Sequence, residues 1–208
     1  MEPENQLYFP HGQFRQLATF RMARLIYDLT VWFCNAFINK RSRTHDQMVQ
    51  AARSGVQNIA EGNQMGATSK KMEMKLTGVA RASLEELRLD YEDFLRQRGH
   101  LPWSPDHPAL RRFRALRIAT FASFMEWLHR ENERGDHRSP ASRTKLARPE
   151  QKHPPHQAIL AANGILSLLN LCCYWLDRQL QAQARSFERD GGFTERLYKY
   201  RRRFKKKD

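Results

Sequence analysis

The fold is decided by the stretch Arg53-Ser54-Gly55-Val56-Gln57-Asn58-Ile59-Ala60-Glu61-Gly62 and by the helical pattern that follows a short polar turn and ends near Leu95. In that pattern, apolar side chains recur mostly every three or four residues, which is typical of one buried stripe on a helix. The stripe consists of Met72, Leu76, Val79, Leu84, Leu87, Tyr91 and Phe94. We therefore expect one long amphipathic helix here.

Small residues mark where a neighbouring backbone can approach this stretch closely. Gly55, Ala60 and Gly62 lie within a helical pattern. Glycine inside a helix costs about 1 kcal/mol relative to alanine, so its presence there needs a packing or turn reason. We expect that reason to be contact with another helix.

Two blocks of the sequence resemble a known family. The first joins Asn58-Ile59-Ala60-Glu61-Gly62 to Ala82-Ser83-Leu84-Glu85-Glu86-Leu87, at the distance found in bacterial four-helix-bundle proteins. That family includes proteins encoded within intervening sequences of large-subunit ribosomal RNA genes and the accessory variability protein of diversity-generating retroelements. The second block, Ala162 to Tyr198, resembles the C-terminal suffix of one subset of the family. The motif residues are Asn58, Glu61, Gly62 and Glu85.

The resemblance implies an assembly and partners. Its retroelement members resemble barrel-like homopentamers with a positively charged surface, so self-assembly is implied here and a homopentamer is one expected copy number. The same resemblance implies a role in holding template RNA and a reverse transcriptase together. An inserted segment and the suffix distinguish this chain from the short members of the family.

Composition limits the classes of partner. The chain has 208 residues, 40% of them hydrophobic, and a net charge of +14, which favours polyanionic partners. No apolar run of membrane-span length and no signal-peptide pattern are evident in the sequence, so we expect no membrane association. Cys34, Cys172 and Cys173 form no CxxC motif, so we expect a reducing, cytoplasmic location rather than a disulfide framework.

Helical patterns divide the chain into an arm, a bundle and a tail. Residues 1–12 are expected to be a flexible arm, and residues 13–189 an all-α, antiparallel up-down four-helix bundle. Residues 190–208 follow the break at Asp190-Gly191-Gly192 and form a basic helical suffix. The bundle helices are predicted at about 13–40, 45–62, 69–95 and 156–189, with Thr44 and Ser69 as N-caps of the second and third.

The region of about 100–155 is expected to be an insertion between the third and fourth core helices. Its pattern predicts one helix from about Pro108 to Glu133. A Pro-, Ser- and Arg-rich loop from Arg134 to Pro155 should follow.

The residues that could carry chemistry do not form a catalytic pattern. Ser54 and Ser83 lack a nearby histidine base, and Gly62-Asn63-Gln64-Met65-Gly66 lacks the Lys-Ser/Thr of a P-loop. None of the motif glutamates Glu61, Glu85 and Glu86 is followed by a histidine three residues later, which argues against a di-metal bundle. We therefore expect no enzyme activity, no metal site and no cofactor.

The carboxylates of the family motif favour a structural role. Glu61 or Glu85 is expected near the bundle interior or a subunit contact, paired with Arg53 or Arg81. Arg81 and Glu85 also have the i,i+4 spacing of a helical ion pair.

Positive charge is the remaining functional signal. It gathers in four separate runs, and aromatic residues interleave with the last of them, where they could stack on unpaired bases. The residues predicted to contact phosphate are Arg41, Arg43, Lys70, Lys71, Arg111, Arg112, Arg114, Arg201, Arg202, Arg203, Lys205, Lys206 and Lys207.

Two functions remain open from the sequence. The preferred one is a non-enzymatic, oligomeric accessory protein that grips the backbone of RNA, in preference to DNA, or of an RNA–DNA hybrid. The alternative is an oligomeric protein–protein scaffold whose basic faces bind an acidic protein partner. A solvated face or a solubilising tail also explains any single basic run.

Overall fold

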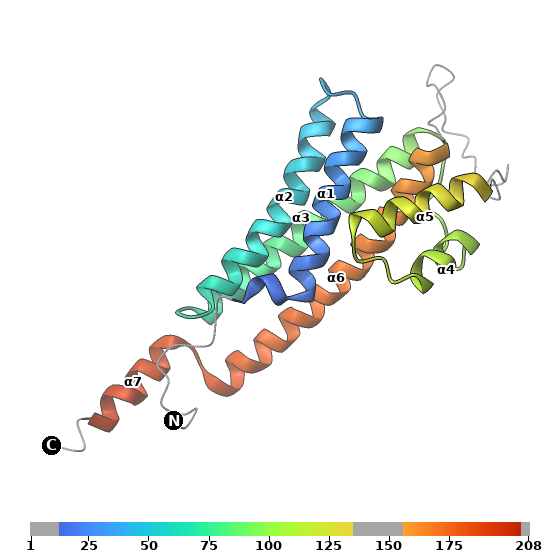
Figure 1. Ribbon diagram of the computed structural model, residues 1–208. Coiled ribbons are helices and arrows are strands. Elements are labelled where there is room, and N and C mark those ends of the chain that lie inside the picture. Colours follow the sequence, from blue (N-terminus) through green and yellow to red (C-terminus); the bar gives the residue numbers. More distant parts are fainter. Residues whose placement is uncertain (1–12, 135–155, 205–208) are drawn as a thin grey trace.

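The computed structural model describes residues 13–134 and 156–204 and is entirely helical in these ranges, apart from the turns and loops that join the helices (Figure 1). A 3₁₀ turn at Phe14–Gln16 precedes α1 (Ala18–Phe37), α2 (Arg43–Met65) and α3 (Lys70–Gln97). Two shorter helices, α4 (Pro108–Ala115) and α5 (Phe121–Arg134), come next, and α6 (His156–Asp190) and α7 (Phe193–Phe204) complete the order. The predicted arm 1–12, most of the predicted loop and Lys205 to Lys207 lie outside the described residues.

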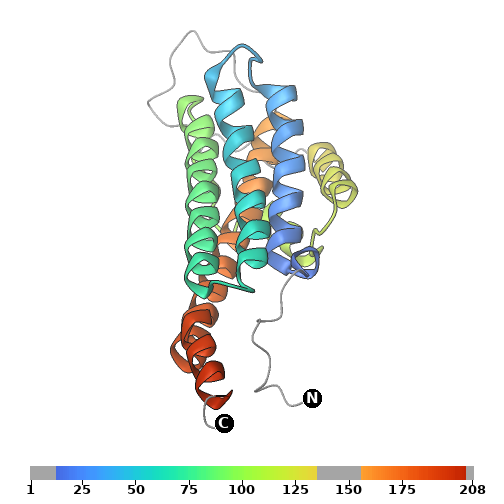
Figure 2. The ribbon, with the colours of Figure 1, turned by 90° about the vertical axis from the view of Figure 1, so that its left-hand side faces the viewer.

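The long helices pack antiparallel into a bundle. α1 contacts α2, α2 contacts α3, α3 contacts α6, and α6 contacts α1. Figure 2 shows α1, α2 and α3 side by side with α6 behind them. α5 packs on α6 and α1, and α4 packs on α6. The prediction of an all-α helical bundle is confirmed at this level.

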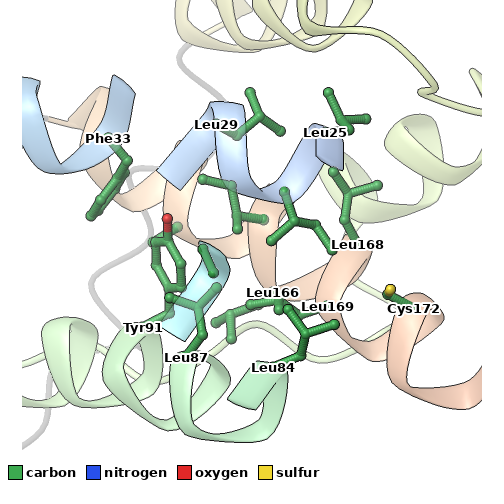
Figure 3. Packing of buried hydrophobic residues seen from close by; sticks show 14 of the residues in the cluster. Leu25, Leu29, Phe33, Leu84, Leu87, Tyr91, Leu166, Leu168, Leu169 and Cys172 are labelled. Atoms are coloured by element: carbon green, nitrogen blue, oxygen red, sulfur yellow. The ribbon is translucent and has the colours of Figure 1, made fainter. Parts of the chain in front are cut away.

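Apolar side chains from three of these helices meet in the core (Figure 3). Leu25, Leu29 and Phe33 of α1 face Leu84, Leu87 and Tyr91 of α3 and Leu166, Leu169 and Cys172 of α6, and all are buried. The ring of Tyr91 is fully buried, and its hydroxyl donates a hydrogen bond to Thr30 Oγ1 at 3.2 Å. That bond satisfies the one polar atom that the ring carries into the core.

The N-caps of α2 and α3 are serines. Ser69 accepts a hydrogen bond from the Met72 amide at 3.2 Å, which confirms the predicted cap of α3. For α2 the predicted cap, Thr44, is wrong, because Ser42 Oγ accepts from the Thr44 amide at 3.2 Å and the helix begins at Arg43. Ser42 has the extended backbone that an N-cap requires.

The first half of α3 buries a different stripe from the predicted one. Val79 is 40% exposed, and Met72 and Leu76 are not fully buried. The buried positions are instead Glu73, Thr77 and Ala80, which continue into Leu84 and Leu87 at steps of four and three. The prediction failed because it followed apolar residue type, whereas two of the buried positions are polar and hydrogen-bonded across the bundle.

The single helix predicted from Pro108 to Glu133 is two helices. α4 ends at Ala115, and Arg117 has a positive φ of 48°, which a helix interior does not accommodate. Thr120 and Ser123 then cap α5 reciprocally: the Ser123 amide donates to Thr120 Oγ1 at 3.1 Å, and the Thr120 amide donates to Ser123 Oγ at 3.2 Å. This reciprocal cap resembles a capping box, and it fixes the start of the second helix.

Among the described helices, α6 alone is long and apolar enough to meet the length and composition of a membrane span. One 18-residue window of it has a mean hydropathy of 1.7, which by length and composition alone would suffice to cross a membrane, contrary to the expectation from the sequence. Within the structure, 67% of that window is buried, as expected of a central core helix. The helix ends as predicted before Gly191, whose positive φ of 69° ends the helical backbone before α7.

Candidate nucleic-acid interface

The predicted basic residues lie at both ends of the bundle and along its side. Arg41 and Arg43 are both exposed, in the turn between α1 and α2 and at the first residue of α2. Lys71 is exposed near the opposite end, at the turn between α2 and α3, and α7 extends from that same end (Figures 1 and 2). The structure therefore does not gather all the predicted residues on one face.

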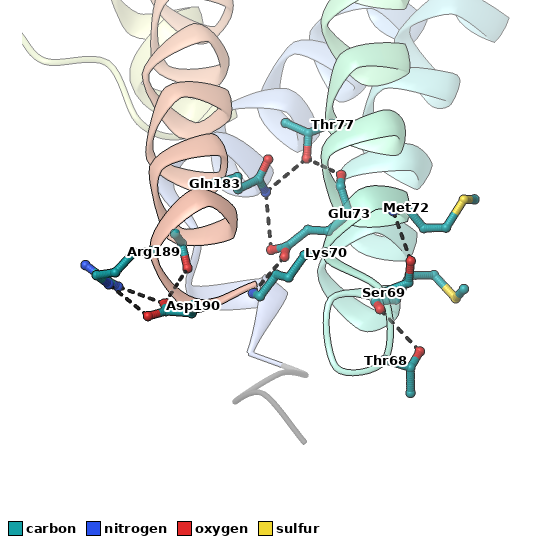
Figure 4. Close-up of polar contacts among 11 residues, drawn as sticks. Thr68, Ser69, Lys70, Met72, Glu73, Thr77, Gln183, Arg189 and Asp190 are labelled. Carbon is teal, nitrogen blue, oxygen red and sulfur yellow. Dashed lines mark hydrogen bonds and ion pairs between the residues drawn. The ribbon is translucent and has the colours of Figure 1, made fainter. Parts of the chain in front are cut away.

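The cation of Lys70 is neutralised inside the molecule (Figure 4). Lys70 Nζ lies 2.9 Å from Glu73 Oε2, and only 14% and 11% of the two side chains are exposed. Gln183 of α6 donates to Glu73 Oε1 and to Thr77 Oγ1, both at 3.2 Å. Burial of a carboxylate demands such partners. We therefore remove Lys70 from the predicted phosphate contacts and assign it to structure.

Gly66 belongs to the same cluster. A Cβ at Gly66 would lie 2.7 Å from Glu73 Oε2, although the φ of this glycine, −57°, is open to any residue. Glycine is needed at this position for space rather than for backbone freedom. Gly66 after α2, Lys70, Glu73 and Thr77 of α3 and Gln183 of α6 thus form one polar cluster. The apolar pattern of the sequence did not reveal this cluster.

Three arginines of α4 have different surroundings. Arg112 forms two hydrogen bonds of 2.7 Å with the carboxylate of Glu131 on α5, and Glu131 is 2% exposed. Arg111 and Arg114 are exposed and donate to main-chain carbonyls instead, of Asp106 at 3.0 Å and of Pro105 at 2.6 Å. Carbonyls orient a guanidinium without cancelling its charge, so Arg111 and Arg114 stay available to an anion and Arg112 does not.

The C-terminal suffix is helical, as predicted, and carries exposed cations. Arg201 and Arg202 are exposed on α7. The side chain of Arg203 lies outside the described part, as do Lys205, Lys206 and Lys207. By sequence, residues 193–208 contain eight Lys or Arg and two acidic residues, so this segment is a strong concentration of positive charge.

The motif residues that carry the resemblance lie on α2 and α3, which pack against each other. Asn58 Nδ2 donates to the carbonyl of Ser54 at 2.9 Å, and the hydroxyls of Ser54 and Ser83 are hydrogen-bonded at 2.9 Å. Gly62 is buried, and a Cβ there would lie 3.2 Å from the Glu73 carbonyl and from Leu76 Cβ. Small and amide-bearing side chains therefore let these two helices approach closely, as the sequence predicted for Gly55 and Gly62.

An open groove of about 470 Å³ runs along the same pair of helices. Arg43, Gln47 and Gln50 line it from α2, and Ser83 and Glu86 line it from α3. The groove places one predicted cation, Arg43, beside Ser54 of α2 and Ser83 and Glu86 of α3.

The two motif carboxylates have separate positions. Glu85 pairs with Arg81 at 2.7 Å, as predicted, and also with Arg88. Arg81 further pairs with Asp177 of α6 at 3.1 Å, so the network joins α3 to α6. Hydrogen bonds from Arg88 and then Arg81 lower the pKa of Glu85 against the opposing effect of burial. Glu61 is exposed, and within the described ranges it forms no ion pair.

The buried thiols are poorly suited to nucleophilic chemistry. Burial, with a smaller contribution from Asp90, raises the pKa of Cys34 to about 12. Burial also raises the pKa of Cys172 and of Cys173. A thiolate is the reactive form, so these three side chains behave as apolar core residues. Among residues 13–134 and 156–204, no cluster of three or more His, Cys, Asp or Glu could hold a metal ion.

Comparisons of this chain with protein-family models, with curated proteins and with solved structures return no match. The resemblance to bacterial four-helix-bundle proteins stays a hypothesis carried by the motif residues.

Proposed function

We propose that this chain is a non-enzymatic, nucleic-acid-binding accessory protein that grips the phosphate backbone of RNA in preference to DNA. One observation carries the proposal: accessible cations at both bundle ends, on α4 and on α7 have no carboxylate partner in the described part of the chain. They are Arg41, Arg43, Lys71, Arg111, Arg114, Arg201 and Arg202. In a chain of charge +14, such residues favour polyanions.

The contacts would be to phosphate, so the affinity would depend little on base sequence. Lysine and arginine that touch phosphate oxygens position a strand without reading its bases. Cations at both ends of a long bundle could hold two segments of one folded RNA. The basic suffix, as a dense run of charge, would contribute the largest share.

The resemblance supplies the finer form of this proposal. α1, α2, α3 and α6 would form the antiparallel up-down four-helix bundle of the family, with α4 and α5 as its insertion and α7 as its suffix. The protein would work in the cytoplasm as a homo-oligomer, with the pentamer as one copy number. In that setting it would hold template RNA beside a reverse transcriptase.

A second candidate is a scaffold for a protein partner with acidic surfaces. It is favoured by the exposed apolar side chains of α2 and α3, where Met65 and Val79 are 41% and 40% exposed. Exposed apolar side chains are available for contact with a protein partner. The same cations would then meet carboxylates of the partner.

Salt dependence separates the two candidates. Anisotropy of a fluorescein-labelled structured RNA, titrated with nuclease-treated protein, should show log affinity falling linearly with log salt. The slope should be ~0.7–0.9 per phosphate contacted. The triple variant Lys71→Gln, Arg201→Gln, Arg202→Gln should weaken RNA binding. It should also make the slope shallower by the amount expected for the loss of about two to three phosphate contacts.

The matched control removes the same charge from paired, exposed cations: Arg24→Gln, Arg96→Gln, Arg130→Gln. Its slope should stay close to that of the wild type. Equal losses of RNA affinity in both triple variants would show that binding depends on net charge alone and not on these particular cations. Absence of RNA binding at low salt would leave the scaffold as the better account.

A further inference from the structure

A second groove, of about 300 Å³, lies beside the arginines of α4. It is bounded by the 101–107 loop, α3, α4 and α6. Pro102, Trp103 and Leu171 provide apolar walls, and Glu92, Arg114 and Asn170 provide polar groups. An apolar slot of this size with a few convergent polar groups is typical of a small-ligand site.

The tryptophan of this groove is held in place from two sides. Its main-chain amide donates to Asn163 Oδ1 at 2.8 Å, and Asn163 is 2% exposed. Asn163 Nδ2 in turn donates to the Ile159 carbonyl at 2.8 Å, which fixes the amide on α6. The indole stacks on the His107 ring at a centroid distance of 4.0 Å and an angle of 12°. Trp103 is therefore a preformed aromatic wall.

Positive charge borders this wall. Arg114 lines the groove, and its bond to the Pro105 carbonyl ties the guanidinium to the same loop that carries Trp103. Arg111 is tied to the next carbonyl, of Asp106. Arg112, between them in sequence, is neutralised by Glu131. The groove thus has one oriented guanidinium group with uncancelled charge in its lining, that of Arg114, and Arg111 lies three residues before it on the same helix.

We infer that this groove binds a single unpaired nucleotide of a nucleic-acid strand. The base packs against Trp103, Pro102 and Leu171, and its phosphate pairs with Arg114. Asn170 and Glu92 offer hydrogen-bonding groups to the base edge. Charge complementarity selects a nucleotide over an apolar peptide, and the aromatic wall suits a flat base. The inference rests on the proposed function and adds to it a preference for unpaired strands.

The test compares strands that differ only in pairing. Full-length protein is titrated into a labelled single-stranded 20-mer and into the duplex of the same length. Leu171→Glu places a carboxylate at the groove mouth, on a side chain that is already 39% exposed. We expect about a tenfold loss of affinity for the single strand, comparable to losing one stacked base, and little change for the duplex.

The matched control is Leu89→Glu, the same substitution at an exposed leucine of α3 that does not line the groove. It should change the two affinities equally and slightly. Arg114→Gln should likewise weaken binding of the single strand more than Arg178→Gln does. Arg178 is an exposed arginine of α6 outside the groove. Circular dichroism establishes that each variant is folded.

A crosslink locates the base directly. Ultraviolet irradiation with a 5-iodouridine-substituted strand, then trypsin digestion, should yield a modified peptide of residues 99–111, which contains Trp103. A crosslink confined to α7, or equal losses in Leu171→Glu and Leu89→Glu, would overturn this inference and leave the proposed function standing. A protein that binds neither the single strand nor the duplex would overturn both this inference and the proposed function. If the protein binds poly-glutamate and Leu171→Glu abolishes that binding, the occupant of the groove is an acidic peptide, and this inference is overturned.

Discussion

The partner of each arginine decides whether its charge can reach a ligand. Arg112 and Arg114 are two positions apart on one short helix, and the sequence does not distinguish them. Arg112 meets a buried carboxylate, and Arg114 meets a main-chain carbonyl. The first is therefore expected to act on stability and the second on binding.

Arg112→Ala should destabilise the fold, because it leaves the buried Glu131 with a weaker partner. Arg134 lies 3.9 Å from the same carboxylate and limits the loss of stability. We therefore expect the free energy of unfolding, measured with urea, to fall by about 2–3 kcal/mol. Arg114→Ala should stay within ~0.5 kcal/mol of the wild type. The double variant Arg112→Met, Glu131→Leu should recover most of the stability. Equal stability of the two alanine variants would contradict this assignment.

Asp90→Asn should stabilise the protein at neutral pH. Burial raises the pKa of Asp90, and the carboxylates of Glu86 and Asp93 add to the rise. A carboxyl with a raised folded-state pKa destabilises the fold above that pKa, and the effect disappears below its unfolded value of about 3.9. Thermal unfolding should show a Tm raised by a few degrees or less at pH 7 and no difference below pH ~3.9. A lower Tm at pH 7 would refute the prediction.

The spacing between helices depends on where glycine lies along them. A Cβ at Gly55 would lie 2.7 Å from Leu84 Cδ2, so α2 and α3 approach closely here. A Cβ at Gly78, on α3, would have no neighbouring atom within 4 Å among the described residues. The same residue type therefore has a packing role at one position and none at the other.

Gly55→Ala and Gly78→Ala should have opposite effects on stability. The first forces the fully buried Leu84 to move and should cost about 1–3 kcal/mol. The second removes a helix-weakening glycine from open space and should stabilise by ~0.5–1 kcal/mol. Denaturant unfolding of both variants under one set of conditions gives the sign. Stabilisation by Gly55→Ala would contradict the prediction, because it would show that α2 and α3 can move apart without a loss of stability.

For the chain as a whole, self-association and RNA binding should respond oppositely to salt. Subunits of charge +14 repel one another, and salt screens that repulsion. Salt also weakens phosphate contacts, because it reduces the gain from counterion release. Light scattering of nuclease-treated protein should therefore show a multiple of 24.6 kDa that persists or grows as salt rises, while RNA affinity falls. A mass of 24.6 kDa at every salt concentration would refute self-association.

Local patterns predicted most of the helices but not their buried faces. The start of α3 at Lys70, the break at Gly191 and the suffix helix depend on nearby residues, so the sequence was sufficient there, whereas the start of α2 was predicted two residues too late. The buried stripe of α3 depends on Gln183, 110 residues away from Glu73, so apolar type alone misled the prediction there. The break between α4 and α5 was missed, although the Thr120-x-x-Ser123 cap was a readable signal.

The sequence by itself determined the helical class, the order of the long helices and the excess of positive charge, because these follow from local periodicity and composition. Only the tertiary structure decided which cations are free. Whether Lys70 and Arg112 can meet phosphate depends on Glu73 and Glu131, whose burial arises from helices packing together. The groove at Trp103 likewise exists because Asn163 of α6 binds a loop 60 residues earlier in the chain. Such contacts join residues remote in sequence, and no local pattern encodes them.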